Sequence, residues 1–411
     1  MPRLEDITGK PEEPKRFISG QGFKPYLPKY YEIVNGKRRP IIKNNGKEKY
    51  GKPKPIWWPK DHLYIDARQK SINLILTKQN CKDFDKYKFN KPFTELYRSP
   101  DKAVFTPPMV IINHSVSRKA FCNFPVVFRH ALQSITISKK NTSEEDKKLL
   151  MFLSAVLNTN LADYCFFHIS ANLGVERDQV YLEEIELLPF PLPEDTDDLQ
   201  KSRRIIDQIA EDMSKLKASI EKNYIVQEEE TKATMQKIEP LVYDYYGISK
   251  REQMLIEDTV NIFKRSMMPI SVSKEVQTIR IKPTPDERKD YVELLCKILN
   301  SWAKRSKFKV SGKIEFSDIL GTSVVTLCKS EKAKPFQQSK TSDDLQAALK
   351  SIQKVLPEKK GRFTYHRGLK VFDKNNLYIV KPLALRHWTK TAAINDADEI
   401  AAAILSSGRD S

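Results

Sequence analysis

The chain has 411 residues, of which 71 are Lys or Arg and 53 are Asp or Glu, so its formal net charge at pH 7 is +18. This length allows two to four domains and excludes a single small module, and the positive charge favours a polyanion, with nucleic acid preferred over a membrane surface. No apolar run reaches the roughly 18 residues that a membrane helix needs, and the N-terminal MPRLEDITGKPEEP has no apolar signal-peptide core. We therefore expect a soluble, cytoplasmic protein with no membrane partner.

The cysteines and histidines give no sign of a disulfide framework or a metal site. The cysteines are widely spaced, odd in number and never form a CxxC pair: Cys81, Cys122, Cys165, Cys296 and Cys328. The six histidines do not have the spacing of metal ligands either. We expect reduced thiols, no bound metal and no cofactor.

Residues 1–60 concentrate the positive charge, with 15 Lys and Arg against 6 Asp and Glu. Asn-Gly pairs at 35–36 and 45–46 predict hairpin turns whose tips carry cations, and aromatic residues interleave with them as in surfaces that hold phosphates beside stacked bases. For the tryptophans, an aromatic core beside a charged surface is an equal alternative. We predict DNA contacts from Lys24, Tyr26, Lys37, Arg38, Arg39, Lys43, Lys47, Trp57 and Trp58.

Short apolar runs predict strands at 104–105, 109–112, 126–128 and 134–137. Polar and cationic residues follow two of these strands, where side chains can reach base edges or phosphates. An ordinary surface loop is the alternative. The residues predicted to contact DNA here are His114, Ser115, Ser117, Arg118 and Lys119 after the second strand, and Arg129 and His130 after the third.

Three helices are predicted next. Ser143 and Asp146 form a capping signature before an apolar helical pattern over 149–161. A third helix begins at Ser249, with Glu252 three residues on, and runs to Phe263. Between them, apolar residues recur at intervals of 3, 4, 3 and 4, the spacing of a short coiled-coil seam. We predict that this seam docks a partner through Ile206, Ile209, Met213, Leu216 and Ile220.

A linker over 266–290 separates a C-terminal domain with helices at 291–302, 345–356 and 397–405 and strands at 308–316, 323–327, 369–372 and 377–380. The predicted class is α+β. Its parts are a mixed, β-rich domain expected to bind DNA (1–195), a helical spacer for partner docking (196–268) and a small α+β accessory domain (285–411).

Catalytic motifs are present only in broken form, so we predict no catalytic residue. Thr106-Pro107-Pro108-Met109 lacks the polar and aromatic residues that hold a flipped adenine, and Gly20 and Gly22 lie in Pro-rich, basic sequence unlike a cofactor loop. Pro285-Asp286 and Glu230-Thr231-Lys232 stand in the wrong order for a metal-dependent nuclease. A divergent enzyme with its site in 285–411 remains an alternative, with His366, Arg367, Arg386, His387 and Asp396 as its polar residues.

Several segments, in order, resemble the specificity domain that follows the methyltransferase in TaqI-like, adenine-specific restriction–modification enzymes. Gly20–Tyr26 resembles the segment directly after the catalytic domain, and Leu149–Leu161, with Asn158-Thr159, resembles a helix that normally reads L-x-x-x-L-N-S. Further segments that carry the resemblance are Val110–Ser117, Gly174–Arg177, Leu188–Pro191 and Val242–Ile248. The resemblance covers about residues 15–265, and residues 369–405 more distantly resemble tails of bacterial restriction and phage-defence proteins.

The resemblance implies a DNA-binding module that chooses where a partner methylates adenine or cleaves, and it adds Arg177 to the expected DNA contacts. Because no methyltransferase sequence precedes the match, we expect a separate specificity subunit whose partners are double-stranded DNA and a methyltransferase or nuclease subunit. The alternatives are the C-terminal part of a single-chain methyltransferase or restriction enzyme, and an assembly protein whose basic surface binds RNA or an acidic protein.

Overall fold

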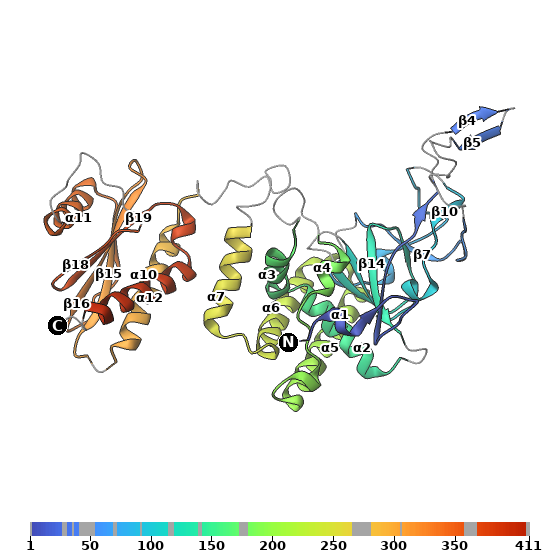
Figure 1. The fold of residues 1–411 in the computed structure, drawn as a ribbon, viewed down its shortest axis with the longest axis horizontal. Helices are drawn as coiled ribbons and strands as arrows, with labels where there is room; N and C mark the ends of the chain where they lie inside the picture. Colours follow the sequence, from blue (N-terminus) through green and yellow to red (C-terminus); the bar gives the residue numbers. More distant parts are fainter. Residues whose placement is uncertain are drawn as a thin grey trace. The chain divides into compact units, whose positions relative to one another are not determined.

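The computed structural model describes residues 2–26, 31–34, 37–40, 54–68, 72–90, 93–113, 119–138, 142–171, 180–264, 281–304, 306–356 and 368–407. The chain combines helices with mixed sheets, so the predicted α+β class is confirmed (Figure 1). It divides into two compact units, Met1–Ser249 (unit 1) and Lys250–Ser411 (unit 2). This differs from the three parts expected, because the predicted spacer is shared between the two units.

The largest sheet of unit 1 has the order β1-β2-β14-β11-β12-β8. The central pairs are antiparallel and the outer pairs, β1–β2 and β12–β8, are parallel. The predicted strands at 109–112 and 134–137 lie at its centre. Its strands are β1 (Thr8–Gly9), β2 (Phe17–Gln21), β8 (Leu74–Ile75), β11 (Met109–Asn113), β12 (Lys119–Cys122) and β14 (Leu132–Ile137).

The predicted strand at 104–105 is wrong. These residues end a 3-10 helix, Lys102–Phe105, because the Asp101 carboxylate accepts a hydrogen bond from the Ala103 amide at 2.8 Å and caps its first turn. Val104 and Phe105 are still buried, so their apolar character is used for packing and not for strand pairing.

Two small sheets and a hairpin complete the β-rich part of unit 1. One sheet has the order β3-β10-β6, and the other, β13-β7-β9, contains residues 127–128 of the strand predicted at 126–128. Strands β4 and β5 pair antiparallel, with Val34 opposite Lys37. The turns expected at Asn35-Gly36 and Asn45-Gly46 lie outside the described residues. The strands are β3 (Lys24–Pro25), β4 (Tyr31–Val34), β5 (Lys37–Pro40), β6 (Lys54–Pro55), β7 (Leu63–Ile65), β9 (Lys82–Asp83), β10 (Glu95–Arg98) and β13 (Val127–Phe128).

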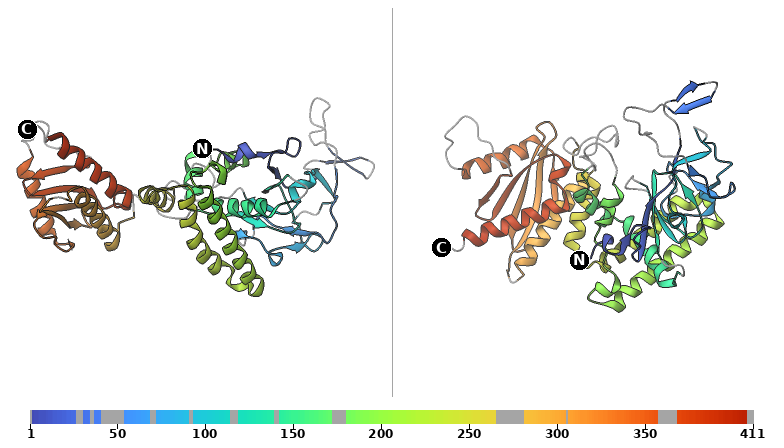
Figure 2. Two further views of the ribbon diagram at one scale, coloured as in Figure 1. Left: turned by 90° about the horizontal axis from the view of Figure 1, so that it is seen from below. Right: turned by 45° about the vertical axis from the view of Figure 1, so that its right-hand side comes forward.

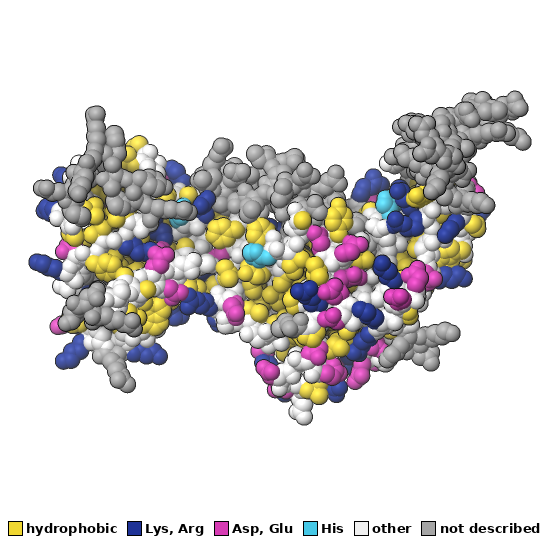
Figure 3. All heavy atoms as spheres, in the orientation of Figure 1, with side chains coloured by type: hydrophobic (Ala, Val, Ile, Leu, Met, Phe, Trp, Pro, Cys, Tyr) yellow, Lys and Arg dark blue, Asp and Glu magenta, His cyan; other side chains and the backbone are white. Residues whose placement is uncertain are grey.

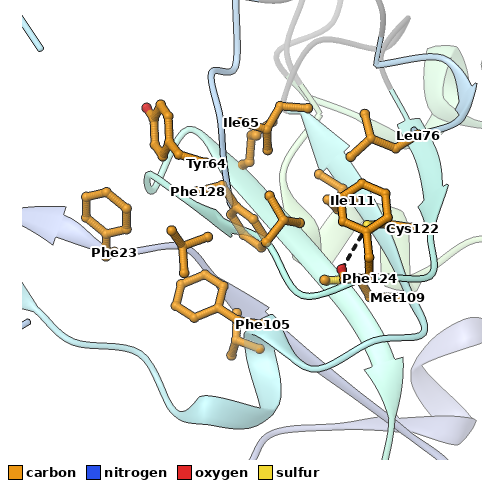
Figure 4. Packing of buried hydrophobic residues seen from close by; sticks show 14 of the residues in the cluster. Phe23, Tyr64, Ile65, Leu76, Phe105, Met109, Ile111, Cys122, Phe124 and Phe128 are labelled. Atoms are coloured by element: carbon orange, nitrogen blue, oxygen red, sulfur yellow. Dashed lines mark hydrogen bonds between the residues drawn. The ribbon is translucent and has the colours of Figure 1, made fainter. Parts of the chain in front are cut away.

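An aromatic core holds the three sheets together (Figure 4). The Phe23 ring lies 5.0 Å from Trp58, and Trp58 packs edge-to-face on Phe84 at 5.5 Å. Trp58 is only 4% exposed, so the prediction that it stacks on nucleic acid is wrong in this structure and the alternative of a core residue holds. Trp57 is half-buried, with the Lys102 ammonium 5.5 Å from its ring.

Gly20 and Gly22 are required by close packing. A Cβ on Gly20 would lie 2.4 Å from the Val104 side chain, and one on Gly22 would lie 2.3 Å from the Phe128 carbonyl oxygen. The absence of a side chain at Gly22 therefore lets the chain after β2 run directly along the end of β13.

Helices cover one side of the large sheet (Figure 2). They are α1 (Leu4–Ile7), α2 (Glu144–Leu157), α3 (Asn160–Ile169), α4 (Leu182–Glu186), α5 (Leu199–Lys222) and α6 (Gln227–Tyr245). The Ser143 cap is confirmed, since its hydroxyl accepts from the Asp146 amide at 3.1 Å. The predicted helix to Leu161 breaks at Asn158, and Thr159 caps α3 instead. In the described ranges no single helix is long and apolar enough to cross a membrane; α2 and α3 together match that length and composition, with a 68° bend between them.

The predicted docking seam on α5 is buried within unit 1. The seam faces α6 and α2, and none of its residues is more than 6% exposed. The prediction that it docks a partner is therefore wrong, because unit 1 already covers this apolar face. The residues concerned are Ile206, Ile209, Met213, Leu216 and Ile220.

Segments that carry the family resemblance meet in this helical part. Phe190 is buried against Phe152 at 5.7 Å, and Phe152 lies 4.5 Å from Tyr245. The Tyr245 hydroxyl donates to the Pro191 carbonyl at 2.8 Å, and Tyr246 donates to Pro189 at 2.9 Å. The Leu-Pro-Phe-Pro segment is thus clamped between α2 and the end of α6.

Unit 2 is a five-stranded sheet of order β17-β15-β16-β19-β18 between two helical layers (Figure 1). Helices α10 and α12 cover one face, and α11 covers the other. Alternation along β19 explains this, since Leu377 and Ile379 face α10 and α12 while Tyr378 faces α11. The elements are α7 (Lys250–Asp258), a π-helical turn (Thr259–Phe263), α10 (Pro285–Trp302), β15 (Lys309–Ser317), β16 (Thr322–Ser330), β17 (Gln337–Ser339), α11 (Ser342–Val355), β18 (Lys370–Asp373), β19 (Asn376–Pro382) and α12 (Lys390–Ser407).

Candidate nucleic-acid interface

The parallel pairing of β13 with β7 brings two polar segments together. Val127 pairs with Tyr64 and Phe128 with Ile65. Because parallel strands end at the same edge of a sheet, the residues after each strand become neighbours: Asp66, Ala67 and Arg68 after β7, and Arg129 and His130 after β13. The edge of this small sheet therefore gathers cations from positions more than sixty residues apart in the chain.

A pocket of about 300 Å³ opens at this edge, and we call it the edge pocket. Its walls combine aromatic rings with cationic, amide and carboxylate groups. Figure 4 shows Tyr64 at the margin of the aromatic core with its hydroxyl directed away from the other labelled residues. Aromatic faces suit base stacking and Arg suits phosphate or base edges. The lining residues are Tyr64, Asp66, Ala67, Arg68, Tyr87, Phe89, Asn90, Arg129, His130 and Ala131.

Asp66 organises one wall of the edge pocket. Its carboxylate accepts from both Nε and Nη2 of Arg68 at 3.1 Å, and from the Tyr87 hydroxyl. Burial by itself would raise the pKa of Asp66, but the hydrogen bonds from Arg68 and Tyr87 outweigh it and lower the pKa to about 2. Asp66 thus stays ionised and holds in place the guanidinium of Arg68, a side chain that is 73% exposed.

Asp66→Asn is expected to lower the free energy of unfolding of unit 1 by about 1–2 kcal/mol at pH 7, a value reduced for solvent screening at Arg68. Because the folded-state pKa of Asp66 lies below the ordinary 3.8, its contribution is present above about pH 4 and is lost as pH falls toward 2. Denaturant titrations between pH 2 and 7 should therefore show the two proteins converging at low pH. Asp85→Asn, an exposed carboxylate in the same region, is the matched control; a constant difference at every pH would contradict the expectation.

A cationic sheet adjoins the edge pocket. In the sheet β3-β10-β6, Lys24, Lys54 and Arg98 are exposed, and the Lys24 ammonium lies 5.2 Å from the Tyr97 ring. The link to the pocket is Phe23, whose amide donates to Phe128 and whose carbonyl accepts from the His130 amide, at 3.0 and 2.8 Å. Figure 3 shows Lys, Arg and His side chains gathered at this β-rich end of unit 1.

The structure brings together part of the predicted DNA-contacting set. Arg129 and His130 line the edge pocket, and Lys24 follows Phe23, whose carbonyl accepts from the His130 amide. Tyr26 follows β3, and its amide donates to the Glu95 carbonyl. For Lys37, Arg38 and Arg39 only the backbone is described, as strand β5. The predicted residues outside the described ranges are Lys43, Lys47, His114, Ser115, Ser117, Arg118 and Arg177.

Lys119 is not a surface residue, so its predicted DNA contact is wrong in this structure. It is 2% exposed, and its ammonium donates to the Leu157 carbonyl at the end of α2, at 2.5 Å. Asp163 lies 3.9 Å away and the Phe166 ring 5.2 Å away. Lys119 follows the polar run 114–118 in sequence, but it is the first residue of β12, and its side chain points into the helical layer.

Sequence reasoning missed Arg68, Arg98, Tyr87 and Asn90. Arg68 comes shortly after the run LYI at 63–65, whose apolar and aromatic residues could have suggested a strand ending at Ile65. Nothing local distinguishes Tyr87 or Asn90 from other loop residues, because their place in the pocket depends on the chain folding back after β9.

The alternative enzymatic residues of 285–411 do not form one site among the residues that are described. His366 and Arg367 lie outside them, Arg386 and His387 belong to a 3-10 turn at Leu385–His387, and Asp396 is paired with Lys370 and Lys381 inside unit 2. The described ranges also contain no group of three or more His, Cys, Asp or Glu side chains that could hold a metal ion.

Comparison with known proteins adds no family: no protein-family model matches this chain, and no curated protein is significantly similar to it in sequence. The class defined by the fold and by the candidate site is thus an α+β protein with a cationic, aromatic-walled pocket at the edge of a small sheet.

Proposed function

We propose that this chain is a DNA target-recognition component of a bacterial restriction–modification or phage-defence system, and that a partner adenine methyltransferase or nuclease performs the chemistry. In this proposal the edge pocket and the adjoining cationic sheet of unit 1 meet double-stranded DNA. The observation that carries the proposal is the parallel β13–β7 pairing, which places Arg68, Arg129 and His130 around aromatic walls.

The chemistry of this surface supports nucleic acid over other anions. Lys24, Lys54 and Arg98 supply positive charge along one small sheet, as phosphate contacts require. The edge pocket adds stacking faces and an Asn90 amide, which can discriminate bases by hydrogen bonding. Phosphate contacts would position the duplex, and the pocket would read it.

The resemblance to specificity domains supports the partner half of the proposal. Two segments that carry the resemblance pack against α2 and against each other in the helical layer: Leu188–Pro191 and Val242–Ile248. They support the fold, whereas the exposed cations of the β-rich part are available to bind DNA. Such a division, a packed helical support beside a cationic β-rich surface, suits a domain that selects a site and leaves catalysis to another polypeptide.

Duplex-DNA titrations with the full chain test the proposal. Lys24→Ala and Arg129→Ala are each expected to weaken binding about ten-fold and to reduce the slope of log affinity against log salt by roughly 1, because one phosphate is no longer neutralised. Lys215→Ala on α5 removes the same charge from a side chain that is 66% exposed, and it should leave both quantities nearly unchanged.

Three results would contradict the proposal or parts of it. Equal losses from Lys24→Ala and Lys215→Ala would mean that net charge, not this surface, binds DNA. RNA competing better than duplex DNA would favour the assembly-protein alternative. Metal-dependent nicking, or adenine methylation by the purified chain alone, would overturn the assignment of chemistry to a partner.

A further inference from the structure

Unit 2 contains a wide apolar groove that DNA recognition does not use. It has a volume of about 800 Å³ and lies where the C-terminal turns of α10 and α12 meet the ends of β16 and β19. Trp302 ends α10 and Ala303 follows it, Ile404 and Leu405 come from α12, and Phe372 comes from β18. The groove therefore joins two helix ends to the sheet and is formed entirely within unit 2.

The groove leaves large apolar side chains in water. Leu405 is 70% exposed, Ile404 53% and Trp302 50%, although each belongs to a helix whose other residues pack on the sheet. Burying one such side chain in a complex contributes about 1.5–3 kcal/mol, and clustered exposure of this kind marks interaction sites. Binding of a partner's apolar surface would therefore be favoured at this groove.

The rim of the groove is cationic. Lys329 and Lys374 line it, and Lys304 and Lys307 lie on the connection from α10 to β15, between the lining residues Ala303 and Val310. The ion pairs found in the described residues include none of these four lysines. The lining acid, Asp398, is already paired with Arg251. Two helix C-termini add about half a negative charge each, which the lysines outweigh.

From this charge complementarity we propose that the groove docks an amphipathic helix of a partner protein, with its apolar face on Trp302, Phe372 and Leu405 and acidic residues toward the lysine rim. The groove is open and bounded by helix ends, as in helix-in-groove recognition. It also offers the apolar docking surface that the buried α5 seam does not. The proposal does not depend on DNA binding by unit 1.

Two synthetic peptides provide the probes. Both carry the same Leu and Phe face at helical spacing, and their outward positions hold Glu in one and Lys in the other. Calorimetric titration of the full chain is expected to show the acidic peptide binding at least ten-fold more tightly. Leu405→Asp should weaken that binding ten-fold or more, and the pair Lys329→Glu and Lys374→Glu should abolish or reverse the charge preference.

The matched control is Ile319→Asp, which places the same charge on an apolar residue of unit 2 that is 97% exposed and outside the groove. It should leave peptide binding unchanged, and circular dichroism should show all variants folded. Equal affinity for both peptides, or equal effects of Leu405→Asp and Ile319→Asp, would overturn the proposal. Two other results would also overturn it. Self-association of the chain that Leu405→Asp abolishes would assign the groove to a second copy of the chain. Binding of laurate without binding of either peptide would assign it to a lipid.

Discussion

Asp396→Ala is expected to destabilise unit 2 by about 3–5 kcal/mol, because it leaves a buried ammonium without its counter-ion. The Asp396 carboxylate on α12 pairs with Lys381 of β19 and, at 2.8 Å, with Lys370 of β18. The Tyr291 hydroxyl of α10 donates to the same carboxylate at 2.5 Å. One acidic side chain therefore joins both helices to the sheet.

The burial of Lys381 makes the effect large. Its side chain is 9% exposed, and its ammonium lies 4.2 Å from the Tyr291 ring. Burial lowers the pKa of Lys381 while Asp396 opposes that shift. Lys370 retains Glu399 when Asp396 is removed. Lys381 retains the Tyr291 hydroxyl and ring and, at 6.0 Å, the Trp388 ring, but these described partners carry no negative charge.

Hydrogen exchange of peptides from α12 and β19, followed in the full chain against denaturant, measures this loss locally. Asp398→Ala, two residues along the same helix, is the matched control: its side chain is 43% exposed and pairs with Arg251, so its loss should cost no more than about 1 kcal/mol. Similar costs for the two variants would contradict a buried ionic cluster.

Lys119→Ala is expected to destabilise unit 1 by about 2–5 kcal/mol, since it removes a buried side chain and the cation that caps α2. The ammonium meets the Leu157 carbonyl at the helix C-terminus, where a positive charge is favoured. The Asn158 amide fixes the same strand by donating to the Lys119 carbonyl at 3.0 Å. Asn158 belongs to the Asn-Thr pair through which this helix resembles that of the specificity domains, and its role here is to join α2 to β12.

Lys119→Met separates stability from DNA contact. Met retains most of the apolar volume, so this variant should lose less stability than Lys119→Ala and should bind duplex DNA within about two-fold of the original chain. Lys148→Ala, whose side chain is 42% exposed and pairs with Asp207, should cost no more than about 1 kcal/mol. If the Lys119→Met protein bound DNA more weakly while its hydrogen exchange was unchanged, Lys119 would have to contact DNA, contrary to this expectation.

Sequence patterns predicted the regular elements well where a local signal was strong. The capped α2, the amphipathic α5 and the alternating strands of unit 2 appear near their expected positions, because apolar periodicity reflects which face is buried. The same periodicity could not say what buries the face. The apolar seam of α5 was predicted to bind a partner protein, whereas in the structure α6 and α2 of the same unit cover it.

The sequence by itself determined the α+β class, the basic character of the N-terminal part and the strand ends that carry Arg129 and His130. Only the tertiary structure decided that Arg129 lines the same pocket as Arg68 and Tyr87, that Lys119 and Trp58 are buried, and that an apolar groove remains open in unit 2. The physical reason is that periodicity and composition are local, whereas strand pairing and the exposure of an individual cation depend on segments distant in the chain.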